Sequence, residues 1–467
     1  MMPPQPPLPS QPSQPEIPAS PQRRLDVRHA VAVCVGMVIG AGIFKTSPMV
    51  AGALSSSGAL YLAWALGGLL SFVGALCFAE LAAAFPDAGG DYHFLRRAFG
   101  QRLGFLFAWS RFAVIHTGSM ALLAFVFGDY LAQVVDLSPW LGPQASAWLA
   151  AALIVLLTTL QLAGVRVGLG TQLGLMAVVL AGLLLLGAAG LALQGQGLAP
   201  LTPYGTLAVN DPGRHDWGQA LVFVFLAYGG WSDAATLSAE MRDARHGITR
   251  ALLIGLALVM ALYLLANWAY LRGLGLDGLA ASAAPAAALM RRAFGRPGEL
   301  LMVAIVTVTA LSVMNAILIA GPRTTYAAAR DLARELHLGR WDARRGTPTA
   351  ALLATSAVAL ALVAFGAATR GGFSTMVDYL SPVYWFFLRL SGAALIVLRR
   401  REPAAPRPFK VPLYPLLPLL FIGCSAYLFY ASVVYVQAGA LVGLAVLGLG
   451  ALLLLLRPSR RPFSLRR

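Results

Sequence analysis

The chain has 467 residues, of which 58% are hydrophobic and only 12% are charged. A soluble protein of this length cannot bury that much apolar surface and still cover itself with polar groups, so the composition excludes that class. The net charge of +16 would fit a nucleic-acid-binding protein, but arginine and lysine collect in alternate loops between apolar segments. That is the positive-inside pattern of a membrane protein, and no nucleic acid partner is expected.

Residues 1–27 begin with a proline-rich stretch that is almost free of hydrophobic residues. This composition cannot build a core and predicts a disordered cytoplasmic tail. It lacks the basic start and apolar run of a signal peptide, and a later translation start is the alternative. At the other end, residues 457–467 predict a basic cytoplasmic tail. Three cysteines lie in apolar segments and predict neither a disulfide nor a metal site: Cys34, Cys77 and Cys424.

Twelve apolar segments are long enough, at about 20 residues, to cross a bilayer as helices. They are residues 30–54, 58–84, 103–131, 146–164, 171–193, 217–239, 248–271, 299–321, 349–366, 376–398, 413–434 and 437–456. The even number and the arginine-rich loops place both termini in the cytoplasm. Between the second and third segments, residues 85–102 are polar and contain glycine. They predict a short amphipathic element along the inner membrane surface.

Glycines interrupt two of these segments at corresponding places in the two halves of the chain. The first break, residues 38–44, reads VIGAGIF, and the second, residues 226–231, reads LAYGGW. Paired interruptions indicate the binding site of a transporter, since unwound backbone at membrane depth must be buried in protein or line a cavity. The alternative is that these glycines only allow helices to pack closely.

The two breaks offer opposite backbone chemistry. A helix that restarts near Ile43 or Phe44 exposes amide N–H groups and the positive end of its dipole, which suit a carboxylate. A half-helix that ends near Ala227 or Tyr228 leaves carbonyl oxygens without partners, which suit an ammonium group. A site with both ends matches the head group of an α-amino acid.

Four stretches in order carry a family resemblance: GMVIGAGIFKTSP, ELAAAFPDAGGDYHFLRRAFG, FLAYGGWSDAATLSAEMRDARHGITRALL and RPFKVPLYPLLPLLF. They resemble amino acid permeases of the amino acid–polyamine–organocation (APC) superfamily, most closely bacterial members of its L-amino acid transporter branch. The resemblance covers residues 28–456. It implies an all-α membrane protein of twelve transmembrane helices, with two inverted five-helix repeats in a LeuT-like fold and two peripheral helices. The repeats would be residues 28–195 and 217–398, the peripheral pair 411–456, and the helices at 30–54 and 217–239 would be unwound at mid-membrane.

The resemblance also implies roles for the two breaks. The substrate carboxylate would be bound by Ile39, Gly40, Ala41, Gly42 and Ile43. The amine and the start of the side-chain pocket would involve Leu226, Ala227, Tyr228 and Gly229. The sequence departs from the family pattern twice. Leu226 replaces an aromatic gate, so occlusion would rely on Tyr228, Trp231 or another helix, and the position of a coupling lysine in some relatives falls near Val179.

Other polar residues lie within or at the ends of the apolar segments. Asp233 follows the second break and could cap a helix, favour a cation or carry a proton. Ser312 and Asn315 are one turn apart and could line the cavity, and Thr309 with Ser312 weakly resembles half of a sodium site. Residues with an expected gating role are Glu80, Glu240 and Arg111, the first two as ion-paired struts of an inner gate. Arg111 could face the bundle core with His116, or simply pair with a carbonyl or snorkel.

Together these features predict a secondary active transporter for amino acids in the inner (plasma) membrane, with neutral amino acids favoured over cationic ones. No cofactor, metal or enzymatic motif is expected. A coupling proton, a counter-substrate and facilitated diffusion remain open as the driving force. The alternatives are a cationic amino acid or amine exchanger, a non-transporting sensor or channel, and, more remotely, an intramembrane enzyme.

Overall fold

The computed structural model describes residues 26–40, 42–87, 89–135, 137–163, 169–194, 216–239, 241–242, 244–332, 340, 342, 348–369, 371–434 and 438–455. The regular secondary structure of this part is helical. Two residues with predicted roles, Ala41 and Glu240, lie outside the described residues, as do almost all of the two predicted tails.

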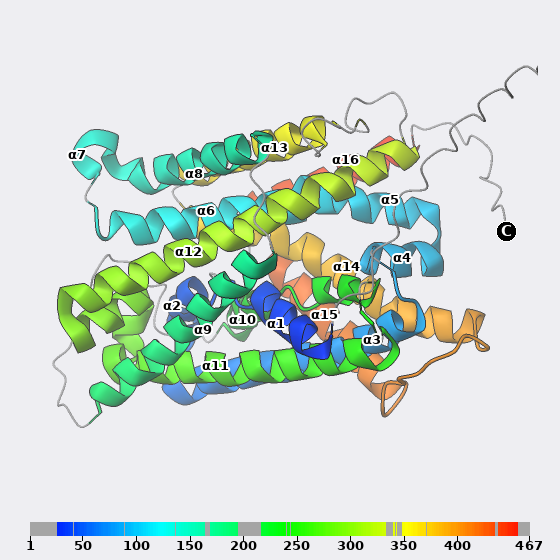
Figure 1. Ribbon diagram of the computed structural model, residues 1–467, viewed down its shortest axis with the longest axis horizontal. Helices are drawn as coiled ribbons and strands as arrows, with labels where there is room; N and C mark the ends of the chain where they lie inside the picture. Colours follow the sequence, from blue (N-terminus) through cyan, green and yellow to red (C-terminus); the bar gives the residue numbers. More distant parts are fainter. Residues whose placement is uncertain are drawn as a thin grey trace, which may run out of the picture.

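The long helices run side by side along the long axis of the molecule (Figure 1). In chain order they are α1 (Val27–Val38), α2 (Ile43–Ala53), α3 (Ser57–Ala84), α4 (Asp91–Phe99), α5 (Gln101–Ser110), η1 (Arg111–His116), α6 (Thr117–Ala132), α7 (Ser138–Leu141), η2 (Gly142–Gln144), α8 (Ala145–Leu162), α9 (Leu169–Ala192), α10 (Trp217–Tyr228), η3 (Asp233–Ala239), α11 (Ala244–Ala280), α12 (Pro285–Leu332), α13 (Thr349–Ala368), α14 (Phe373–Arg401), α15 (Leu416–Val434) and α16 (Ala438–Leu455).

Within the described residues, nine helices are long and apolar enough to cross a membrane. The pair α1 and α2, bent by 51° at the first break, makes a tenth crossing if it counts as one span. The apolar helix at the C-terminal end, Gly439–Leu455, is shorter. A helix occupies each apolar segment identified in the sequence, and the chain is a multi-pass membrane protein by this composition.

The first break forms as the sequence predicts: α1 ends at Val38 and α2 begins at Ile43. The second differs in detail, because α10 ends at Tyr228 and the chain continues as a 3-10 helix, η3, rather than as an α-helix. Gly230 has a φ of +99°, and a Cβ there would lie 2.4 Å from the carbonyl oxygen of Met37. Only glycine fits this conformation so close to the end of α1.

Two polar contacts from α6 fix the position of α2, and one of them arises because α2 contains a proline. Pro48 lies inside α2 and has no N–H, so the carbonyl of Phe44, four residues earlier, lacks its helical donor. The hydroxyl of Tyr130 in α6 donates to that carbonyl at 2.7 Å. Lys45 adds a second tie, since its Nζ lies 2.5 Å from Asp129 Oδ2 of α6 and 2.9 Å from the carbonyl of Ala283. The lysine beside the first break is therefore already paired.

The predicted amphipathic element exists as α4, which buries Phe94, Leu95 and Ala98 and exposes Arg96 and Arg97. It packs against α5 and α14 at the end of the bundle where α3 and α14 finish, on the right of Figure 1. We call this the basic end, because Arg399, Arg400 and Arg401 form the last turn of α14 there.

Glycines allow the closest helix contacts, and substitution of Gly443 tests the contact between α16 and α14. A Cβ at Gly443 of α16 would lie 2.1 Å from the carbonyl oxygen of Tyr379 in α14, and a backbone atom cannot move aside. Gly443→Val should therefore lower the free energy of unfolding by about 1–3 kcal/mol, as overpacking does. Gly448→Ala, on the same helix with open space around it, is the control. Thermal unfolding of the purified proteins measures both, and equal midpoints would contradict the α14–α16 contact.

Candidate functional site

The two breaks lie against each other. A Cβ at Gly42 would be only 3.3 Å from Cα of Ala227, so the backbone that opens α2 touches the backbone that closes α10. Gly42 is the N-cap residue of α2 and has no side chain with which to cap it. The amide end of one half-helix therefore lies beside the carbonyl end of another, as the sequence predicts.

The start of α2 has two backbone amides ahead of its first hydrogen-bonded turn. The carbonyl of Gly42 accepts from the amides of Lys45 and Thr46, at 2.9 and 2.8 Å, which closes the first turn of α2. The amides of Ile43 and Phe44 precede that turn and have no intrahelical acceptor. On the other side of the break, the amides of Ile39 and Gly40 donate to carbonyls of α1. Of the predicted set, Ile43 thus offers a donor, while Ile39 and Gly40 use theirs internally.

The carbonyl end contains a residue that the sequence did not single out. The Tyr263 hydroxyl of α11 lies 3.1 Å from the carbonyl oxygen of Val38 and 3.0 Å from that of Ala227. Its one proton is therefore shared between the last carbonyls of α1 and α10. Tyr263 also packs with Tyr228 and Trp64, at ring-centroid distances of 5.1 and 5.5 Å. The only hint of this role in the sequence is that Tyr263 places a polar hydroxyl inside a run of apolar residues.

A small cavity of about 10 Å³ adjoins the first break. It is lined by Gly36, Ile39, Met176, Val179, Leu180, Thr309, Ser312 and Val313. Its volume is close to the minimum for one water molecule. The structure therefore brings together Ile39, Ser312 and the position flagged at Val179. Asn315 points elsewhere, since its Oδ1 accepts from Gln161 of α8 at 2.7 Å.

Asp233 and Arg111, predicted separately, form an ion pair. Arg111 Nη2 lies 2.5 Å from Asp233 Oδ1. Arg111 begins η1, a π-helical turn, which often marks a functional position. Within this turn the carbonyl of Ala113 accepts from the Tyr379 hydroxyl at 2.7 Å and from the Thr117 hydroxyl at 2.9 Å. Of the alternatives that the sequence left open for Arg111, the structure has its guanidinium on a carboxylate.

Trp231 and Leu226, the remaining residues of the second break, pack and hydrogen-bond within the protein. Trp231 is buried and packs edge-on against Phe78, with ring centroids 5.0 Å apart, and against Phe421 at 6.1 Å. It lies between α3 and α15 rather than over the first break. The Leu226 carbonyl accepts from the Gly229 amide at 3.0 Å, which closes the end of α10.

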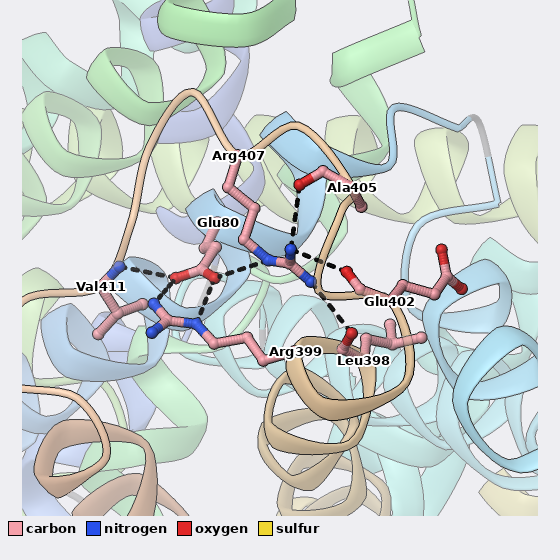
Figure 2. Close-up of polar contacts among 7 residues, drawn as sticks. All are labelled: Glu80, Leu398, Arg399, Glu402, Ala405, Arg407 and Val411. Carbon is pink, nitrogen blue, oxygen red and sulfur yellow. Dashed lines mark hydrogen bonds and ion pairs between the residues drawn. The ribbon is translucent and has the colours of Figure 1, made fainter.

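Glu80 anchors a polar cluster at the basic end, away from the breaks (Figure 2). Its carboxylate accepts from Arg399 Nε at 2.6 Å, from Arg399 Nη2, and from the amide of Val411 at 2.7 Å. Arg407 Nε lies 3.4 Å from the same carboxylate. Its Nη1 donates to the carbonyls of Glu402 and Ala405, and its Nη2 donates to that of Leu398. The cluster therefore joins α3, α14 and the segment that leads to α15. Nearby, a cavity of about 690 Å³ is lined partly by His93, Arg97 and Glu402.

Comparison with known proteins assigns the family. The chain matches the amino acid permease family over residues 25–449. It is 30% identical over 409 residues to the large neutral amino acids transporter small subunit 2 of Mus musculus, covering 86% of this chain and 75% of that protein. It is 27% identical to the b(0,+)-type amino acid transporter 1 of the same species, over 88% and 83% of the two chains. For the Asc-type amino acid transporter 1 of Mus musculus, identity is 29% over 88% and 76%.

This chain belongs to the amino acid permease family. Amino acid transport, not an enzymatic reaction, is therefore its function. The relatives reported above are animal transporters, so they support the family and not the narrower resemblance to a bacterial branch.

Removing one hydroxyl tests the Tyr263 bridge. Tyr263→Phe leaves the ring packing intact but removes the hydroxyl that the carbonyls of Val38 and Ala227 share, while Val38 keeps the Gly40 amide as a donor. The free energy of unfolding should fall by about 0.5–1.5 kcal/mol, the usual net value of a hydrogen bond. The control is Tyr430→Phe, at an exposed position of α15. Thermal unfolding in detergent is the measurement, and a Tyr263→Phe midpoint equal to that of the control would argue against the bridge.

Two ion pairs at the basic end allow a matched comparison. Glu80 is only 1% exposed, whereas Arg97 and Glu402, also paired through two hydrogen bonds, are 41% and 31% exposed. Glu80→Gln leaves two buried arginines without their carboxylate and should cost about 3–5 kcal/mol of unfolding free energy. Glu402→Gln should cost at most about 1 kcal/mol. Denaturation curves of the two variants measure both losses of unfolding free energy. Equal losses would show that the Glu80 cluster does not hold the helices together.

Proposed function

We propose that the chain moves neutral L-amino acids across the plasma membrane by alternating access, with the substrate head group held between the two breaks. The observation that carries this proposal is the contact of Gly42 with Ala227. It sets the first amides of α2 beside the last carbonyls of α10, so that a carboxylate and an ammonium group can be bound by one short stretch of backbone.

The proposed fold has twelve transmembrane helices, with two inverted five-helix repeats at residues 28–195 and 217–398 and a peripheral pair at 411–456. The corresponding positions of the two broken helices support this division. In this arrangement both termini are cytoplasmic, and the basic end faces the cytoplasm, consistent with its arginines. Glu80 then closes the inner side of the pathway by tying α3 to α14, and Arg111 does the same between η1 and η3.

Substrate selectivity follows from the charge at the second break. Asp233, the acid nearest to the proposed amine site, is already paired with Arg111 at 2.5 Å. A cationic side chain would have to compete with this guanidinium for the carboxylate, whereas a neutral side chain would not. One relative is named for the transport of large neutral amino acids, which agrees with the neutral class. A cationic amino acid exchanger is the alternative within the same class.

A thermal-shift screen of the purified protein against the common L-amino acids tests this function without assuming a driving force. A ligand that binds only the folded protein raises the unfolding midpoint. Neutral amino acids should raise it, and arginine and lysine should not. Uptake of radiolabelled L-leucine into proteoliposomes then separates a transporter from a sensor or channel. A sensor would bind amino acids without time-dependent accumulation or exchange.

The site itself is tested by filling the space between the breaks. Gly42→Leu adds a side chain at a position only 3.3 Å from Ala227, so it should abolish L-leucine binding and uptake while the protein stays folded. Gly52→Leu, also in α2 but with open space at its Cβ, is the control and should bind and transport normally. Retained leucine uptake by a folded Gly42→Leu protein would show that the substrate binds elsewhere.

A further inference from the structure

A second cluster of buried charge lies beside the second break, contributed by three separate elements. Arg111 comes from the π-helical turn η1, Asp233 from the start of η3, and Asp91 from the first turn of α4. Arg111 also lies within 3.1–3.3 Å of His116 Nε2. A guanidinium can only donate, so Nε2 must accept, and His116 is then neutral with its proton on Nδ1.

Among the described residues of this cluster, two carboxyl groups act electrostatically on one guanidinium, since both Asp91 and Asp233 influence Arg111. Tyr384 of α14 lies in the same field and shares a hydrogen bond with Ser232, beside the second break. An uncompensated negative charge in a buried site is costly, and the usual outcome is that one group takes up a proton.

The surroundings of the two carboxyl groups decide which one holds the proton. Asp233 contacts Arg111 directly and its side chain is 43% exposed. Asp91 is 7% exposed, and within the described part of the chain its Oδ1 is buried without a hydrogen-bond partner. Burial raises the pKa of the Asp91 carboxyl to about 8. The negative charge of Asp233 raises this pKa further, whereas the positive charge of Arg111 and a hydrogen bond from the Asp91 backbone amide lower it. Asp91 lies in α4, outside the candidate membrane spans.

We propose that Asp91 is a proton-binding site that is coupled through Arg111 to the second break. This inference rests on the proposed amino acid transport and assigns a coupling ion to it. With the proton bound, Asp91 is neutral and Arg111 pairs with Asp233. This ion pair holds η3 against η1. When the O–H bond of Asp91 breaks and the proton passes to water, the new carboxylate competes with Asp233 for the same guanidinium. The hold of Arg111 on Asp233, three residues after Gly230, is then weakened.

The proposed site differs in place from a lysine on α9. The position flagged at Val179 carries no charge, and the small cavity there is lined by apolar groups and two hydroxyl side chains. Asp91, by contrast, lies in α4, which packs against α14 and η3 near the basic end. The effect of a proton bound at Asp91 is transmitted to the second break through Arg111 and Asp233.

Proteoliposomes with L-leucine as the probe test the proposal. Two assays are run: exchange with the same pH and leucine concentration on both sides, and accumulation driven by an acidic exterior. Asp91→Asn, which imitates the protonated acid, should still exchange leucine, but its accumulation should fall to the level of protein-free vesicles. Asp91→Glu keeps a titratable group and should retain accumulation. Asp87→Asn, four residues away at a half-exposed carboxylate, should behave as the unchanged protein.

The outcomes separate this inference from the proposed function. Acid-driven accumulation by Asp91→Asn equal to that of the unchanged protein would overturn the inference. Exchange without any acid-driven accumulation in the unchanged protein would also overturn it, while leaving amino acid transport intact. If the unchanged protein shows neither exchange nor uptake, the proposed function itself fails.

Stability against pH provides an independent readout. A carboxyl whose pKa is raised on folding stabilises the protein fully below its unfolded pKa of about 4, and this stabilisation is lost as the pH rises towards about 8. The unfolding midpoint of the unchanged protein and of Asp87→Asn should therefore fall between about pH 6 and about pH 9, and that of Asp91→Asn should fall less. Parallel profiles, or a failure of Asp91→Asn to fold, would contradict a neutral carboxyl at this position.

Discussion

The structure depends on one backbone contact, between the start of α2 and the end of α10. Gly42 and Ala227 touch because neither presents a large side chain, and Gly230 lets the chain turn directly beneath the end of α1. Two half-helices then meet with opposite partial charges, which makes a dipolar site from backbone alone. The Tyr263 hydroxyl connects the carbonyl ends of both broken helices, so the surroundings of one break are linked to those of the other.

Ion pairs, each with at least one partly or fully buried partner, tie the helices of the bundle together. Lys45 joins α2 to Asp129 of α6, Arg111 joins η1 to Asp233, and Glu80 joins α3 to α14 through Arg399. In a chain that is only 12% charged, each of these pairs spans helices far apart in sequence. Breaking a buried pair is costly, whereas exchanging one partner for another is much less so. Such pairs are therefore suited to hold alternative helix arrangements.

Apolar run length and glycine pairs made the helices and both breaks predictable from sequence, and the polar, glycine-containing stretch before α5 made α4 predictable. The encounter of Val179, Ser312 and Ile39 around one small cavity was not predicted, because it depends on how α9 and α12 pack against the first break. Tyr263, Asp91 and the Arg111–Asp233 pair were not predictable as partners, because their contacts join elements that only the tertiary fold brings together. The 3-10 form of η3 and the partner of Asn315 depend in the same way on packing against other helices.

The account is tested most directly by a structure of the protein with L-leucine bound. It predicts the leucine carboxylate within hydrogen-bond distance of the amides of Ile43 and Phe44. The leucine ammonium group should lie at the carbonyl end of α10, close to Ala227 and Tyr228. Leucine bound away from both breaks, for example in the cavity of about 690 Å³ near Arg97 and Glu402, would contradict it.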